Sequence, residues 1–159
     1  MQRVYHFLAV LFISVFVNAQ VFNQAIADEI QKVDSVINLL INYENIGPKP
    51  TGSPALVETL EWIVENYKDY GYVPIIDTFK LGSIESYNII IEKQGSIPNQ
   101  WIIIGAHYDS VEESPGANDN GTGVISTLQI ARIINDLNPR IGVRIINFGA
   151  EEQGFIGSS

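Results

Sequence analysis

Apolar residues recur at three- and four-residue spacing in two segments of the N-terminal half, and this is the period of an amphipathic helix. The first predicted helix covers residues 23–44. Its apolar positions are Ile26, Ile30, Val33, Ile37 and Leu40. The second covers residues 54–70, where Ser53 is placed to cap the helix, Pro54 fits the first turn and Gly71 can end it.

The pattern changes to that of strands beyond this helix. Residues 75–81 and 87–92 mix apolar and polar positions, which indicates an edge or antiparallel pair. Residues 101–105 and 143–148 are continuous apolar runs, typical of strands covered on both faces. A predicted helix at residues 121–137 separates them, so strand, helix and strand form a crossover unit. The fold class expected is therefore α/β, with a mixed, largely parallel sheet flanked by helices.

The N-terminus has the layout of a secretory signal peptide over residues 1–19. Arg3 precedes an apolar run at residues 7–17, and small residues lead to a cleavage point after Ala19. A membrane anchor is the alternative, but the run is shorter than the roughly 20 residues that span a bilayer. We therefore expect an exported protein, periplasmic or secreted and bacterial, with no stable membrane insertion after cleavage.

Composition and net charge indicate a single packed domain and argue against nucleic acid as a partner. The 159 residues are 46% hydrophobic and 17% charged, which is typical of a single packed domain and not of a disordered chain. The formal net charge of −9 leaves no basic patch for phosphates, so nucleic acid is not an expected partner. The chain contains no cysteine, so disulfides are excluded.

Candidate chemistry gathers where the buried strands end. His107 and Asp109 follow the first apolar run, Asp119 lies in the next loop, and Glu151 and Glu152 follow the second run. One imidazole with several carboxylates on loops at a sheet edge is what a hydrolytic metal site requires. Asp109 is a candidate to hold the second ring nitrogen of a metal-binding histidine, although it could simply open a turn.

Two details of these loops bear on metal binding. A carboxylate at Asp119 could bridge two divalent ions, while the surrounding residues also fit plain turn chemistry, with Asn120 or Thr122 capping the next helix. Glu151 and Glu152 repel one another, and a cation would relieve that repulsion. If the segment is extended, their side chains diverge, so that one can bind metal while the other reaches a water molecule.

These segments strongly resemble peptidase family M28, a family of zinc peptidases, in matching order from about Asn45 to the last residue. The motifs are TGSP (51–54), GAHYDS (105–110), PGANDNGTG (115–123) and FGAEEQG (148–154). The resemblance implies a zinc-peptidase-like α/β/α sandwich, and residues 20–159 would be the N-terminal part of one catalytic domain. It also implies a cis peptide bond between Asp119 and Asn120.

The resemblance assigns a role to each candidate residue. By analogy with the family, His107 binds one zinc ion, Asp119 bridges two, and Glu152 binds the other. Glu151 would be the general base, and Asp109 is the acid behind the histidine. The protein would then be an aminopeptidase that cleaves peptides by means of a metal-activated water.

Family members supply a further Asp and a final His ligand from later segments, and this chain has neither, so a C-terminally truncated domain is expected. Two other functions stay open. One is a glutaminyl-peptide cyclotransferase-like enzyme, since enzymes that resemble this family perform cyclisation with one zinc ion. The other is a catalytically inactive, peptidase-like binding domain. Oligomeric state and substrate side-chain preference cannot be derived from the sequence.

Overall fold

The computed structural model describes residues 24, 27, 28 and 33–159, so the predicted signal peptide lies outside the described residues. The helices are α2 (Val33–Asn45), α3 (Pro54–Asp69), the short π-helix η1 (Ala117–Gly121), α4 (Thr122–Asn135) and the 3-10 helix η2 (Ile156–Ser158). The strands are β1 (Ile75–Leu81), β2 (Ile84–Lys93), β3 (Trp101–His107) and β4 (Gly142–Phe148). Within this part of the chain, no helix is long and apolar enough to cross a membrane.

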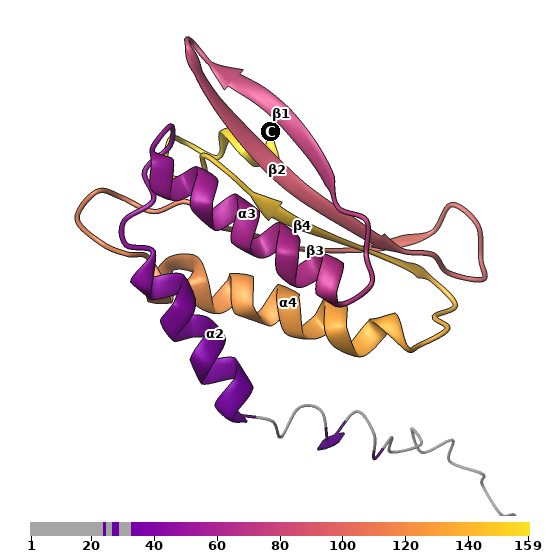
Figure 1. Cartoon of the computed structure of the whole chain (residues 1–159). Helices are drawn as coiled ribbons and strands as arrows, with labels where there is room; N and C mark the ends of the chain where they lie inside the picture. The colour runs from indigo at the N-terminus through magenta and orange to yellow at the C-terminus, as the bar shows by residue number, and fades with distance from the viewer. Residues whose placement is uncertain (1–23, 25–26, 29–32) are drawn as a thin grey trace, which may run out of the picture.

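The four strands form one mixed sheet in the order β1-β2-β4-β3. β1 and β2 form the predicted antiparallel pair, β2 is antiparallel to β4, and α4 joins the parallel neighbours β3 and β4 (Figure 1). The predicted mixed α/β architecture and its strand–helix–strand unit are confirmed. Parallel pairing among the described strands is limited to β3 and β4, because the β1–β2 hairpin supplies the other half of the sheet.

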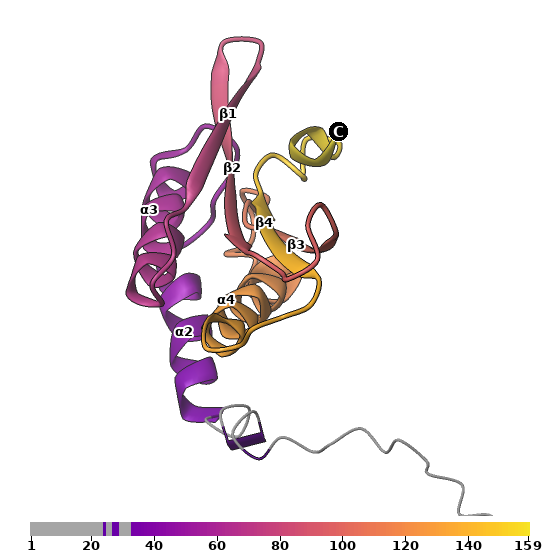
Figure 2. The ribbon, with the colours of Figure 1, turned by 90° about the vertical axis from the view of Figure 1, so that its right-hand side faces the viewer.

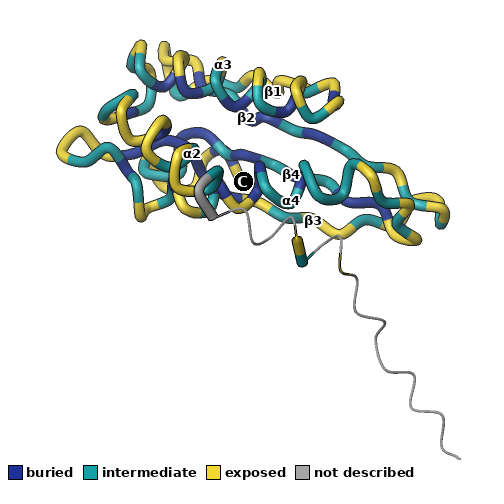
Figure 3. The backbone as a smooth tube through the Cα atoms, turned by 60° about the horizontal axis from the view of Figure 1, so that its bottom comes forward, coloured by how far each residue is buried: buried dark blue, intermediate teal, exposed yellow. Residues whose placement is uncertain are grey.

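Helices α2, α3 and α4 lie together on one side of the sheet (Figure 2). α3 packs against β2, while α4 packs against β3 and β4. The buried positions run along the inner sides of these helices and along the central strands (Figure 3). Fully buried aromatic and aliphatic side chains, including Tyr43, Tyr67, Tyr108, Leu128 and Ile145, fill the space between the layers.

The boundaries of α3 are those predicted, because they depend on local chemistry. The Ser53 hydroxyl accepts a hydrogen bond from the Leu56 amide at 3.1 Å, and Pro54 begins the helix. Gly71 follows the helix with φ of +88°, a conformation that glycine adopts without strain. The helix predicted over residues 23–44 is described continuously only from Val33, and two of its apolar positions, Ile26 and Ile30, lie outside the described residues.

The expected burial of residues 101–105 on both faces is wrong for the described chain. Ile102 and Ile103 are 50% and 61% exposed. The helices α2, α3 and α4 cover only one face of the sheet (Figure 2), and β3 is also an edge strand that pairs only with β4. In contrast, β4 lies between two strands, and its Val143 and Ile145 are buried as predicted.

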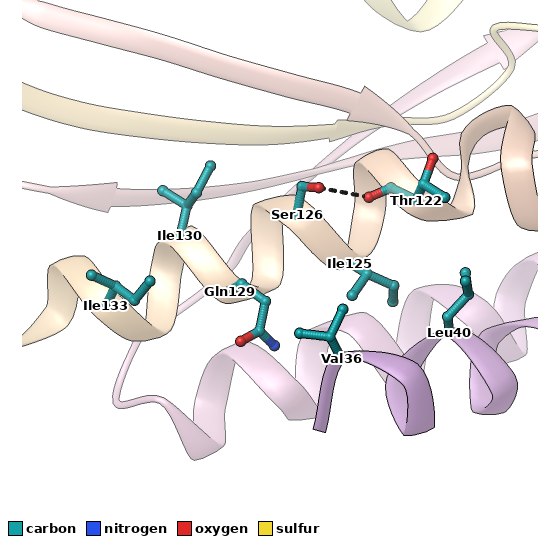
Figure 4. A pocket seen from close by; sticks show the side chains of 8 residues that line it. All are labelled: Val36, Leu40, Thr122, Ile125, Ser126, Gln129, Ile130 and Ile133. Carbon is teal, nitrogen blue, oxygen red and sulfur yellow. Dashed lines mark hydrogen bonds between the residues drawn. The ribbon is translucent and has the colours of Figure 1, made fainter. Parts of the chain in front are cut away.

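A cavity of about 460 Å³ is lined by residues of α2 and α4 (Figure 4). Its lining residues are Val36, Leu40, Thr122, Ile125, Ser126, Gln129, Ile130 and Ile133. None of them is titratable, and none belongs to the predicted metal site. The cavity is thus a gap in helix packing that lies apart from the candidate chemistry.

Candidate metal centre

The candidate residues leave the sheet at one edge because β3 and β4 are parallel neighbours. His107 is the last residue of β3 and pairs with Phe148, the last residue of β4. The Tyr108 amide extends this pairing by donating to the Phe148 carbonyl at 2.9 Å. The loops that begin at Tyr108 and at Gly149 therefore start side by side, as the sequence predicted.

The chain turns sharply after β4. A Cβ atom on Gly149 would lie 2.6 Å from both the Ser86 hydroxyl and the Tyr87 carbonyl oxygen, so β2 leaves room only for glycine there. The next residue, Ala150, is buried and has a φ of 57° in the left-handed region. The expectation of an extended segment with diverging glutamates is wrong, because Glu151 begins a turn in which its carbonyl accepts from the Gly154 and Phe155 amides.

The Asp109 carboxylate stabilises the turn that follows β4. Its carboxylate is fully buried and accepts hydrogen bonds from the amides of Glu151 and Glu152, both at 3.1 Å. One of its oxygens also lies 3.5 Å from His107 Nδ1, and the Asp109 carbonyl oxygen lies 3.2 Å from the same nitrogen. Asp109 thus lies behind the histidine as predicted, and it also holds the main chain of both glutamates, which the sequence did not reveal.

Three side chains converge close to Asp109. Ligand atoms of His107, Glu151 and Glu152 all lie within 4.8 Å of one another. His107 Nε2 is 3.8 Å from a Glu151 carboxylate oxygen and 3.0 Å from Asp119 Oδ1. Asp119 therefore touches the histidine from the opposite loop, but its side chain is 79% exposed and it lies outside the group of three.

Asp119 sits in η1, where the peptide bond to Asn120 is cis, as the resemblance implied. The Asn120 side-chain oxygen accepts a hydrogen bond from the Gly123 amide at 3.1 Å, at the start of α4. The Thr122 hydroxyl instead donates to the Asn118 carbonyl at 3.0 Å. The N-cap position of α4 is Gly121, so neither residue predicted to cap this helix occupies it, although the Asn120 side chain accepts from an amide of the first turn.

The cluster carries an excess of negative charge. Burial lowers the pKa of His107, but hydrogen bonding and charge from Asp109, together with Glu151 and Asp119, outweigh it and raise that pKa to about 9. Burial, followed by the charge of Asp119, raises the pKa of Glu152, although His107 acts in the opposite direction. The raised pKa of His107 shows that the neighbouring acids favour a positive charge at this position, and the charge of Asp119 adds to the effect of burial at Glu152.

The donor set fits a zinc ion. Zinc in proteins is bound by imidazole nitrogen and carboxylate oxygen, and these are the atoms that converge here. His107 and Glu152 would hold it, with Asp119 positioned to join from the facing loop. The α/β fold and this donor set are both compatible with a zinc-peptidase-like domain.

Part of the chain matches a known protein family. Residues 88–159 match the sequence profile of peptidase family M28. The chain is 40% identical over 74 residues to a probable leucine aminopeptidase 2 of Aspergillus oryzae, covering 46% of this chain and 15% of the relative. It is 49% identical over 76 residues to aminopeptidase YwaD of Bacillus subtilis, covering 46% of this chain and 17% of the relative. The chain thus spans about a sixth of the length of these relatives.

Solved structures share the fold. An aminopeptidase from Aneurinibacillus sp. strain AM-1 superposes with a TM-score of 0.73 at 19% identity, over 79% of this chain and 64% of that one. A Zn-dependent exopeptidase from Parabacteroides distasonis superposes with a TM-score of 0.64 at 26% identity, over 74% of this chain and 46% of that one. A glutaminyl cyclase from Porphyromonas gingivalis superposes with a TM-score of 0.68 at 25% identity, over 79% of this chain and 48% of that one. The predicted zinc-peptidase-like fold class is confirmed.

Sequence reasoning missed the residues beneath the site. The Tyr43 hydroxyl donates to the Tyr108 carbonyl at 2.9 Å, directly before Asp109. Lys49 is fully buried, although a lysine between two prolines in a glycine-containing turn reads as exposed. Tyr43 follows Leu40 by three residues and so continues the apolar spacing of the predicted first helix, which was the one available signal.

Proposed function

We propose that the full-length protein is a zinc-dependent aminopeptidase, with residues 20–159 as the N-terminal part of its catalytic domain. The observation that carries this proposal is the convergence of His107, Glu151 and Glu152 at the ends of two parallel strands. The family match and the curated aminopeptidases among its relatives support a peptide substrate.

The proposed roles follow the family assignment. His107 and Glu152 would hold zinc, Asp119 would serve a second ion, and Asp109 would orient His107. Zinc supplies Lewis acidity, which polarises the scissile carbonyl and makes water more acidic. Glu151 takes a proton from the attacking water and passes it to the amine nitrogen as the carbon–nitrogen bond breaks.

A second candidate is glutaminyl cyclisation, because solved glutaminyl cyclases share this fold at similar TM-scores. In that reaction the substrate's own amine attacks its side-chain amide and ammonia leaves, so no peptide bond is cleaved. The choice between the two reactions depends on which nucleophile the complete site activates.

Purified full-length protein, loaded with zinc or treated with a chelator, should be assayed on an aminoacyl anilide and on a peptide with N-terminal glutamine. We expect zinc-dependent release of the aniline and two bound zinc ions per chain. Ammonia release from the glutaminyl peptide alone, with one zinc ion, would establish the cyclase instead. No turnover and no zinc uptake would leave a binding domain.

We also propose that residues 1–19 direct export and are removed. Mass spectrometry of the protein from the culture medium or periplasm should show an N-terminus at Gln20. An intact Met1 on protein that stays inside the cell would contradict this proposal.

A further inference from the structure

Lys49 is fully buried, and it lies outside the segment that matches the family profile. Its ammonium group donates to the Gly47 carbonyl at 2.7 Å and to the Pro115 carbonyl at 2.8 Å. It also lies 3.9 Å from the centroid of the Tyr43 ring. Burying an ammonium group costs several kcal/mol unless its donors are satisfied, so these contacts compensate for a substantial penalty.

The main chain of Lys49 makes a second connection to the same loop. Its amide donates to the Ser110 hydroxyl at 2.9 Å, and its carbonyl accepts from the Ser110 amide at 3.1 Å. Ser110 directly follows Asp109, the carboxylate that holds the amides of both glutamates. Lys49 therefore contacts the loop just after Asp109 and again at Pro115.

The contact between Lys49 and Pro115 bears on the loop that carries Asp119. Pro115 precedes Gly116, whose carbonyl accepts from the Gly121 amide at 2.8 Å and so closes the loop around Asp119. The Tyr43 ring packs on the other end of this loop, where a Cβ atom on Gly121 would lie 2.7 Å from it. Contacts from Lys49 and Tyr43 thus hold the segment that carries Asp119 at both ends.

The Lys49 side chain is mostly charged at neutral pH. Burial lowers the pKa of Lys49 to about 8, while the charge of Glu44 acts in the opposite direction. Most of the amine is therefore protonated at neutral pH and can donate to both carbonyls at once.

We propose that Lys49 is a positioning residue of the metal centre: its buried ammonium fixes the Pro115 carbonyl and thereby the loop that brings Asp119 against His107. The role in catalysis rests on the proposed function, whereas the role in ordering the loop does not. An arginine could replace it, because a guanidinium group can donate to two carbonyls and stack on an aromatic ring.

The test uses the full-length protein with K49M, K49R and, as a matched control, K68M. Lys68 is an exposed lysine of α3 that pairs with Glu65. Three quantities are measured: amide hydrogen exchange of residues 110–121 without metal, zinc affinity by chelator competition, and kcat and KM on an aminoacyl anilide.

K49M should speed exchange in residues 110–121 selectively and weaken zinc binding about 10–100-fold, the usual effect of losing a group that orients ligands. It should lower kcat with little change in KM. K49R should restore most of each quantity, and K68M should change none of them.

Unchanged exchange and zinc affinity in K49M would overturn the proposal, as would faster exchange spread evenly over the sheet with normal zinc affinity. If K49M does not fold, K49Q, which keeps one uncharged donor, is measured in the same way, and wild-type values would overturn the proposal. If the unmodified protein binds zinc but hydrolyses nothing, the proposed function fails while exchange and zinc affinity still decide the role of Lys49.

Discussion

Asp109 connects the two loops of the metal centre through hydrogen bonds to main chain. Both of its oxygens accept glutamate amides, and one oxygen also lies near His107 Nδ1. The side chain is fully buried, so these contacts are shielded from bulk solvent. The position of Glu151 and Glu152 therefore depends on a residue 42 positions away from the first of them.

Asp109→Asn should disrupt this arrangement without changing the size of the side chain. The amide group would place an N–H donor against one of the two main-chain donors, so one hydrogen bond would be lost. We expect zinc affinity of the full-length protein to fall about 10–100-fold, measured by competition with a chelator. Asp69→Asn, at an exposed position in α3, is the control, and equal affinities in the two variants would show that Asp109 does not support the site.

The sequence was sufficient to predict that His107, Glu151 and Glu152 lie close together, because each follows the end of an apolar strand. It could not show that Asp109 binds two amides or that Lys49 is buried. Both features arise from contacts between segments more than 40 residues apart, and no local pattern encodes them.

At the scale of elements, a buried polar network joins α3, α4 and β4. The Tyr67 hydroxyl donates to Asn147 Oδ1 at 2.6 Å, and Asn147 Nδ2 donates to the Thr127 hydroxyl at 2.9 Å. All three side chains are buried, and Asn147 lies near the end of β4, just before the turn that carries the glutamates. The network thus fixes the strand end to both helices.

Tyr67→Phe should leave Asn147 Oδ1 without that donor in the core. The expected loss in free energy of unfolding is about 1–3 kcal/mol, the cost of an unsatisfied buried polar group. Urea denaturation measures it, with Tyr87→Phe as control because the Tyr87 hydroxyl makes only an exposed contact of 3.4 Å with Glu85. Equal losses in the two variants would indicate that the network contributes nothing specific.

Element boundaries were predictable where local chemistry determines them. Ser53 and Pro54 define the start of α3, and the apolar run of β4 indicates its burial. The exposure of Ile102 and Ile103 was not predictable, because a buried strand and an edge strand can have the same apolar run. The layers packed on each face of the sheet decide that difference, and the helices lie on one side of it (Figure 2).

Across the whole molecule, buried tyrosines connect stability to pH. Burial is the largest cause that raises the pKa of Tyr43, Tyr67 and Tyr108 above the ordinary value, and it raises that of Tyr72 to about 12. Their hydroxyls donate hydrogen bonds that link separate parts of the fold. The folded state therefore retains phenol protons that the unfolded chain releases near pH 10.

The tyrosine contribution to stability should be complete below pH 10 and decrease as pH rises from there through about 12, because the folded state binds more protons in that range. We expect alkaline unfolding of the described domain, followed by circular dichroism, to coincide with a cooperative increase in tyrosinate absorbance. Gradual ionisation of all tyrosines near pH 10 in a protein that stays folded would contradict the burial seen here.

The central claim is that His107 and Glu152 hold zinc while Glu151 moves a proton. It is tested most directly by measuring zinc content and aminoacyl anilide hydrolysis in full-length Glu151→Gln, beside Glu152→Gln. We predict that Glu151→Gln keeps its zinc and loses hydrolysis by about 10²–10⁴-fold, the usual contribution of a general base, whereas Glu152→Gln loses zinc. Hydrolysis at the unmodified rate in Glu151→Gln, or loss of its zinc, would contradict the account.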